Sequence, residues 1–184
     1  MTSGYFPLTI LRNKKMLNIE NIIIKTKNFI ICTIKNPHID REEGGHIVVA
    51  CNTNKYTTIE DMPRDVLHEL MDIASICGKY MKEMFANEHI DIGIINYQIN
   101  GNWSALNNVR DPVHMHLYGR AKQSKNQPYG SALFLPDFET GFYDHNQGLT
   151  ISEIAYLKEK LLHDETIKIY LPIERVIKHN KLKG

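Results

Sequence analysis

The chain has 184 residues, 42% of them hydrophobic and 23% charged, so it is long enough to bury one core and has the composition of a globular domain. A formal net charge of +1 gives no electrostatic preference for nucleic acid or a membrane surface. The three cysteines are scattered through apolar segments, which argues against a disulfide framework or a thiolate metal site. No stretch approaches the roughly 18 apolar residues of a membrane span, and no signal-peptide pattern precedes the first strand. We therefore expect a cytoplasmic protein without a membrane partner or a stable nucleic-acid partner.

Strand patterns dominate the first part of the chain. Residues 21–26 and 28–35 are rich in β-branched side chains and almost adjacent, which predicts a β-hairpin. Residues 36–45 contain Pro, Asp and paired Gly, so they predict a loop. This loop leads into a third strand over residues 46–51.

A long amphipathic helix is predicted next. Apolar residues recur at helical spacing from Val66 to Phe85, and Pro63 suits the first turn, where a missing N–H costs nothing. Residues 91–99 then predict a strand. A loop rich in Gly and Asn separates them from another strand over residues 112–118.

The last third of the chain is less regular. A polar stretch and a Gly/Pro/aromatic segment predict an ordered extension, and Thr150 with Glu153 matches the capping box of a second helix. Residues 167–178 predict a strand that is interrupted at Pro172.

These patterns together predict one main domain of the α+β class. We expect an N-terminal arm over residues 1–20, the domain itself over 21–122, and a C-terminal helical extension over 123–184 that packs on the domain.

The stretch DPVHMHLYGR, residues 111–120, holds the most suggestive chemistry. Residues two apart on a strand point to the same face, so His114 and His116 would emerge side by side. Imidazole can act as a nucleophile, an acid, a base or a metal ligand near neutral pH. The pair alone is equally compatible with two solvated or hydrogen-bonded histidines.

The motifs follow one another over residues 21–120 as a hairpin, a loop ending in GGHIVVA, a long helix, a strand, an Asn-Gly loop and HMHLYGR. This order resembles the histidine triad (HIT) family of nucleotide hydrolases and transferases. Members of this family carry three histidines that alternate with apolar residues on one strand. A separate histidine enters an earlier strand, at the position that His46 matches. The resemblance implies a HIT-like antiparallel β-sheet with a long amphipathic helix.

The triad is incomplete in this sequence, which leaves two registers. Either His116 is central and Tyr118 replaces the last histidine, or His114 is central and Pro112 replaces the first. The ending HLYGR reproduces the tail of the family motif and favours the second register. Pro112 would then remove a supporting imidazole.

The resemblance implies a nucleotidyl hydrolase or transferase that needs no cofactor and no divalent metal. It would attack the α-phosphate of a dinucleoside polyphosphate or a nucleoside phosphoramidate through a covalent nucleotidyl-histidine. His114 would be the nucleophile, and His116 would donate to the phosphate oxygens or the leaving group. His46 would help to bind or protonate the leaving group. A homodimer formed through the long helix is also implied.

Several polar residues are implied to bind the nucleotide. Asn36, which follows the hairpin, would contact the ribose, and Asp40 is the alternative for this role. Asn100, which opens the Asn-Gly loop, would lie near the phosphates. Asn107 and Asn108 are alternative amide donors. The nucleotide-binding candidates are Asn36, Asn100, Asn108 and Arg120.

Two other functions stay open at this point. One is a nucleotide-binding module that kept the pocket and lost turnover with the missing triad member. The other is a metal-dependent enzyme with His114, His116 and Asp111 as ligands, because H-x-H with a carboxylate can hold zinc or iron.

Overall fold

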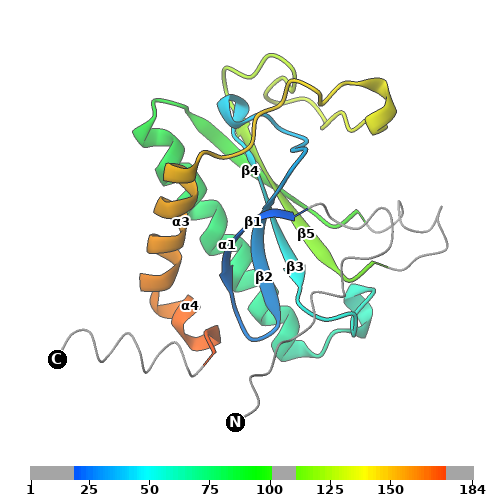
Figure 1. Ribbon diagram of the computed structural model, residues 1–184, viewed down its shortest axis with the longest axis vertical. Coiled ribbons are helices and arrows are strands. Elements are labelled where there is room, and N and C mark those ends of the chain that lie inside the picture. Colours follow the sequence, from blue (N-terminus) through cyan, green and yellow to red (C-terminus); the bar gives the residue numbers. More distant parts are fainter. Residues whose placement is uncertain (1–18, 101–110, 173–184) are drawn as a thin grey trace, which may run out of the picture.

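The computed structural model describes residues 19–100 and 111–172, and its core is an antiparallel sheet (Figure 1). Within these residues five strands pair in the order β1-β2-β3-β5-β4. Every neighbouring pair is antiparallel. The predicted α+β class is therefore confirmed. The strands are β1 (Ile19–Lys25), β2 (Phe29–Ile34), β3 (His46–Cys51), β4 (Ile92–Gln98) and β5 (His114–Ala121).

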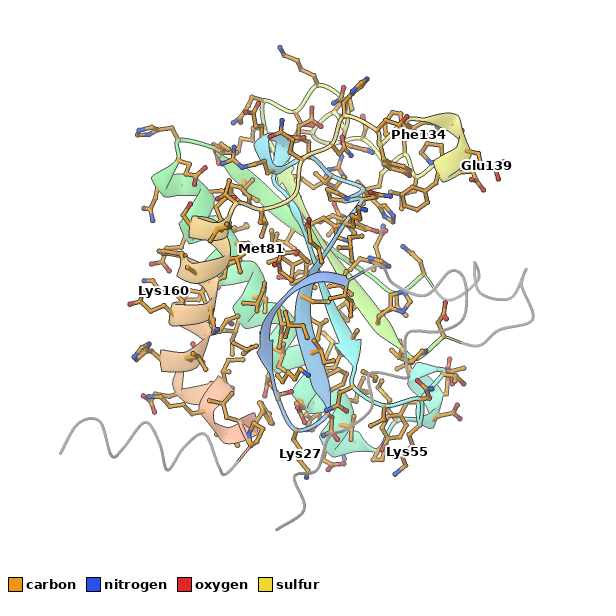
Figure 2. The ribbon with its side chains drawn as sticks, viewed as in Figure 1. Lys27, Lys55, Met81, Phe134, Glu139 and Lys160 are labelled. Carbon is orange, nitrogen blue, oxygen red and sulfur yellow. The ribbon has the colours of Figure 1, made fainter. Side chains whose placement is uncertain are left out.

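Helix α1 (Arg64–Asn87) and helix α3 (Ile151–His163) pack beside each other on one face of the sheet (Figure 1). Their apolar side chains join the main core. Met81 points from α1 into this core, whereas Lys160 extends outward from α3 (Figure 2). None of the helices in the described residues is both long and apolar enough to span a membrane.

The capping box predicted at the start of the second helix is present. The Thr150 side chain accepts from the main-chain N–H of Glu153, whose carboxylate accepts from the main-chain N–H of Thr150. These reciprocal bonds satisfy donors that the first turn leaves free, so the helix begins where the sequence places it.

The prediction of a strand over residues 167–178 is wrong for residues 167–172, which are the part of it that the structure describes. Glu165–Tyr170 forms a short helix, α4, because the Asp164 side chain accepts from the N–H groups of Thr166 and Ile167. Asp at an N-cap favours a helix start over a strand. Ile167 still enters the core, as its apolar character suggested, but from a helix. Residues 173–178 lie outside the described part of the chain.

The sheet has two unlike faces. Met115, Leu117 and Ala121 on β5 belong to the core beneath the helices. The opposite face carries a smaller apolar cluster that includes Val48 and Ala50, together with the alternate residues of β5. Strand alternation thus places the histidines of β5 on the face away from α1 and α3.

Candidate functional site

The three predicted histidines lie together on the face opposite the helices. In the β3–β5 pairing Val48 is opposite His116 and Ala50 is opposite His114. The ring centroids of His114 and His116 are 4.9 Å apart in an edge-on arrangement. His46 Nε2 lies 2.9 Å from His116 Nδ1.

A fourth histidine, His38, completes this cluster and was not predicted from the sequence. It is 3% exposed, its main-chain N–H donates to His46 Nδ1 at 3.1 Å, and its own Nδ1 lies 2.8 Å from the Tyr118 hydroxyl. The sequence marks His38 only by its place in the loop before His46, and a loop has no periodicity to show which side chains turn inward.

The hydrogen bonds define which ring nitrogens carry protons. His46 Nδ1 accepts from a main-chain N–H, so the proton of the neutral ring is on Nε2 and is donated to His116 Nδ1. His116 then carries its proton on Nε2. His114 has the opposite arrangement, because its Nδ1 lies 2.9 Å from the Pro112 carbonyl oxygen, which can only accept. Its Nε2 therefore keeps an unprotonated lone pair.

Burial keeps these rings neutral. It lowers the pKa of His38 to about 4, and it lowers the pKa values of His46 and His116 further, with the neighbouring imidazoles adding mutual repulsion. Burial also lowers the pKa of His114, but the Pro112 carbonyl and the charge of Asp111 oppose this shift. His114 is the most accessible of the three predicted histidines: it is partly buried, whereas His46 and His116 are buried.

The extension after β5 covers one side of this cluster. The ring centroids of Phe138 and Tyr143 lie 5.3 and 5.1 Å from that of His38. The amide of Asn146 donates to the Pro37 carbonyl at 2.9 Å, which ties the extension to the loop that carries His38. Burial of His38 is therefore a product of two segments that are distant in sequence.

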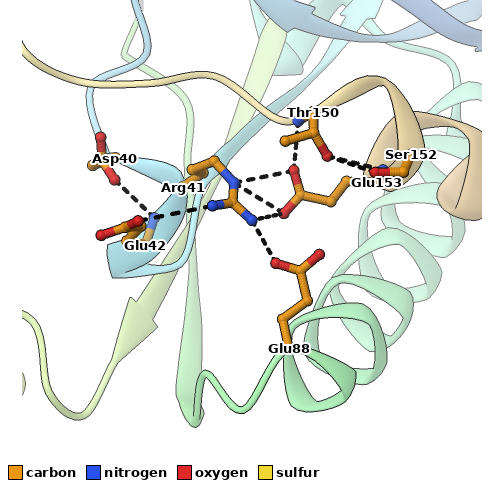
Figure 3. A network of polar contacts seen from close by, with 7 residues as sticks. All are labelled: Asp40, Arg41, Glu42, Glu88, Thr150, Ser152 and Glu153. Carbon is orange, nitrogen blue, oxygen red and sulfur yellow. Dashed lines mark hydrogen bonds and ion pairs between the residues drawn. The ribbon is translucent and has the colours of Figure 1, made fainter.

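The loop over residues 36–45, which we call the His38 loop, is anchored to α3 by an ion pair (Figure 3). Arg41 Nη2 lies 2.8 Å from Glu153 Oε1 and also binds Glu88. Burial alone would raise the pKa of Glu153, but hydrogen bonds from Arg41 and Thr150 lower it below its ordinary value. The loop therefore cannot shift without breaking a charged contact at the start of α3.

The predicted ribose-contacting residues have different surroundings. Asn36 is exposed, two residues before His38. Asp40 accepts from the main-chain N–H groups of Glu42 and Gln147, so its carboxylate has a structural role in the loop. Neither residue is brought into the histidine cluster by a described contact.

Of the predicted phosphate-contacting asparagines, the structure describes only Asn100. The side-chain amide of Asn100 lies close to the Tyr118 hydroxyl, and its buried Nδ2 has no hydrogen-bond partner within the part of the chain that the structure describes. This leaves a donor at the edge of the cluster. Asn107 and Asn108 lie outside the described residues.

The fourth nucleotide-binding candidate, Arg120, has another task in the structure. It is 4% exposed, and its guanidinium donates to Asn96 Oδ1 at 3.0 Å and to the carbonyls of Pro128 and Ser131 at 2.9 and 3.0 Å. These bonds hold the segment after β5. The guanidinium is therefore buried, and its Nε has no hydrogen-bond partner among the described residues.

Solved structures share this architecture with little sequence identity. A histidine triad protein from Bradyrhizobium japonicum aligns with a TM-score of 0.53 at 14% identity, over 76% of this chain and 89% of its own. The chain has the histidine triad fold. A histidine triad protein from Marinobacter aquaeolei aligns with a TM-score of 0.51 at 13% identity, over 80% of this chain and 87% of its own. No family model matches the chain, and no curated protein matches its sequence.

The histidine triad fold of this chain also gathers one set of possible metal ligands among the described residues. His38, His46 and His116 have ligand atoms within 4.8 Å of one another, whereas the predicted set with His114 and Asp111 is not assembled. The His38 N–H donates to His46 Nδ1, so the proton of the neutral His46 ring is on Nε2. A metal bound to His46 Nε2 would have to displace that proton. The hydrogen bonds thus favour a proton-bearing cluster over a metal centre.

Proposed function

We propose that the chain is a nucleotidyl hydrolase or transferase in which His114 attacks the α-phosphate of a nucleotide and forms a covalent nucleotidyl-histidine. The observation that supports this proposal is the hydrogen bond from His114 Nδ1 to the Pro112 carbonyl. It leaves the Nε2 lone pair free on a partly exposed ring, which is the arrangement that a nucleophilic imidazole needs.

The neighbouring residue supplies the complementary group. His116 carries its proton on Nε2 because Nδ1 accepts from His46. A neutral N–H beside the nucleophile can donate to a phosphoryl oxygen as negative charge builds there. His114 and His116 would thus have different roles although they share one face of β5.

The same bond supports the register in which His114 is central. In that register Pro112 stands where the first histidine of the triad would be, and it still supplies a main-chain carbonyl. A carbonyl needs no side chain, so loss of the first imidazole leaves the orientation of the nucleophile intact.

Intact-protein mass spectrometry tests this proposal. We expect a mononucleotide adduct when the protein is mixed with an adenylate donor such as a diadenosine polyphosphate, and its loss in His114→Ala. His68→Ala, at an exposed position on α1, is the matched control and should keep the adduct. Nucleotide-dependent thermal stabilisation without any adduct would instead support the binding module that lacks turnover.

We also propose a homodimer, which the sequence resemblance implied. Met71 on α1 and Ile94 on the edge strand β4 are both 51% exposed, which leaves apolar surface for a second copy. Light scattering should give twice the 21.3 kDa mass of the chain. A mass equal to one chain at micromolar concentration would contradict the dimer.

A further inference from the structure

The hydrogen-bond chain through the cluster ends at a group that cannot release a proton. It runs from the His38 main-chain N–H to His46 Nδ1, and from His46 Nε2–H to His116 Nδ1. If His116 released the proton on its Nε2 to a leaving group, His46 would have to pass its own Nε2 proton to His116 and receive another proton at its Nδ1. A peptide N–H does not supply that proton.

Two further groups of the cluster that carry a proton are held by hydrogen bonds. The proton on His114 Nδ1 is held by the Pro112 carbonyl. The Tyr118 hydroxyl lies at His38 Nδ1, and burial raises the pKa of Tyr118 well above its ordinary value. His46 Nδ1 and His116 Nδ1 each accept a hydrogen bond, so neither nitrogen has room for the second proton that would make its ring an imidazolium acid.

We infer that His38 is a positioning residue whose main-chain N–H holds His46 and His116 in a form that donates a hydrogen bond but no proton, so that the leaving group must depart as an anion. This inference rests on the proposed function. It selects nucleotides with phosphate-type or other stable anionic leaving groups, and it excludes nucleoside phosphoramidates as good substrates.

The bond changes balance without a proton from the protein. The His114 Nε2 lone pair forms a bond to the α-phosphorus while the bond from phosphorus to the leaving oxygen breaks, and that oxygen keeps the electron pair. The ring becomes an N-phosphoryl imidazolium, and its Nδ1–H remains on the Pro112 carbonyl. Water then attacks phosphorus, the electron pair of the N–P bond returns to Nε2, and the proton of the water goes to solvent.

A phosphoramidate makes a different demand. Its leaving nitrogen would depart as an amide anion unless it is protonated first, and that anion is too basic to leave at a useful rate. General acid catalysis contributes about 100-fold to 10,000-fold where it is available. The described residues of the cluster offer no such acid, so we expect this rate deficit on P–N bonds and not on bonds to phosphate or aryl oxygens.

A leaving-group series tests the chemical part of the inference. We expect the 4-nitrophenyl ester of AMP to be cleaved at least about 100-fold faster than adenosine 5′-phosphoramidate by kcat/KM. The phenyl ester, with its more basic leaving oxygen, should fall between them. Comparable rates for the ester and the phosphoramidate would overturn the inference while leaving the nucleotidyl-histidine intact.

Long-range ¹H–¹⁵N NMR of the ring nitrogens tests the positioning role without any substrate. We expect protonated Nε2 and unprotonated Nδ1 for both His46 and His116, with the reverse for His114. His38→Ala keeps the peptide N–H and should keep the His46 signals. His38→Pro removes that N–H and should give His46 a mixture of tautomers.

The outcomes separate the two proposals. A wild-type His46 protonated on Nδ1, or unchanged His46 signals in a folded His38→Pro variant, would overturn the positioning role even if the adduct forms. If His38→Pro does not fold, the wild-type spectrum alone decides the point. Absence of an adduct with every substrate would reject the proposed function, and the ring spectra would still report the tautomers.

Discussion

His114 and His116 are two residues apart on one strand, yet the protein gives them opposite proton positions. A carbonyl faces one ring nitrogen of His114, and a donated N–H faces the corresponding nitrogen of His116. In both cases a main-chain group determines the position of the ring proton: the carbonyl of Pro112 for His114, and the N–H of His38, acting through His46, for His116. Side-chain identity alone therefore does not define the chemistry of the pair.

The hydroxyl of Tyr118 is a hydrogen-bond partner of the buried His38 ring. Tyr118→Phe removes the hydroxyl that lies 2.8 Å from His38 Nδ1 and leaves a buried ring nitrogen without that partner. We expect the free energy of unfolding to fall by about 1–3 kcal/mol, measured by urea denaturation. Tyr129→Phe, at a side chain that is 44% exposed, should change it by less than about 0.5 kcal/mol. Equal losses in the two variants would contradict this role of the hydroxyl.

At the scale of elements, the His38 loop is fixed to three different parts of the fold. Arg41 binds the start of α3, and Glu43 accepts from the main-chain N–H groups of residues 125–127. The third contact is a close approach of Gly44 to Gly119 on β5. Gly44 has a φ of 123°, and a Cβ on Gly119 would lie 1.9 Å from the Gly44 carbonyl oxygen.

Gly119→Ala should therefore displace the His38 loop from β5. The atoms that this Cβ would meet are main-chain atoms of Gly44, so the loop has to move. We expect a loss of more than about 2 kcal/mol in unfolding free energy together with altered ring signals for His46. Gly148→Ala is the control, because its Cβ would meet only the Glu20 carboxylate at 3.5 Å. A Gly119→Ala variant with wild-type stability and spectra would refute the close packing.

The ion pair between Arg41 and Glu153 should contribute to stability because the carboxylate is buried. Arg41→Met leaves the carboxylate of Glu153, which is 1% exposed, without its cation, and we expect a loss of about 2–4 kcal/mol by urea denaturation. Lys160→Met breaks an ion pair of similar length, 2.7 Å, but both partners are more than a third exposed. It should cost less than about 1 kcal/mol. Similar losses would show that burial of Glu153 does not matter.

At the scale of the whole molecule, the buried histidines should make stability depend on pH. The pKa of His38 is about 4 in the folded chain against an ordinary 6.5, and it faces the imidazoles of His46 and His116 and the hydroxyl of Tyr118. Its lowered pKa means that the unfolded chain binds the proton first. The stability present above pH 6.5 is therefore lost as pH falls toward 4.

The expected loss from His38 alone is about 3 kcal/mol by pH 4, since one pKa unit corresponds to about 1.4 kcal/mol. Urea denaturation between pH 7.5 and 4.5 measures the slope. His38→Asn should reduce it, and His68→Gln, at an exposed position, should leave it unchanged. A free energy of unfolding that is the same at pH 5 and pH 7 would contradict neutral burial of the cluster.

Much of this architecture was predictable because it depends on local patterns. The β-branched runs, the apolar spacing of α1 and the Thr150 capping box each specify an element from neighbouring residues. The shared face of His114 and His116 follows from strand alternation alone. The helix at Glu165–Tyr170 was missed because the cap at Asp164 outweighs an apolar alternation that suggested a strand.

The rest of the site depends on contacts between distant segments. The extension with Phe138 and Tyr143 helps to cover His38, and the carbonyls of the loop after β5 help to enclose Arg120. Neither fact has a local pattern. Sequence spacing thus predicted the row of histidines but not the partners that set their protons.

Strand β5 lies between β3 and β4, and its residues 116–118 are paired with both neighbours. The amides of these three residues should exchange with deuterated solvent only when the entire sheet opens, whereas amides of the outer strands can exchange through local fraying. The position of His116 should consequently persist through every excursion short of global unfolding.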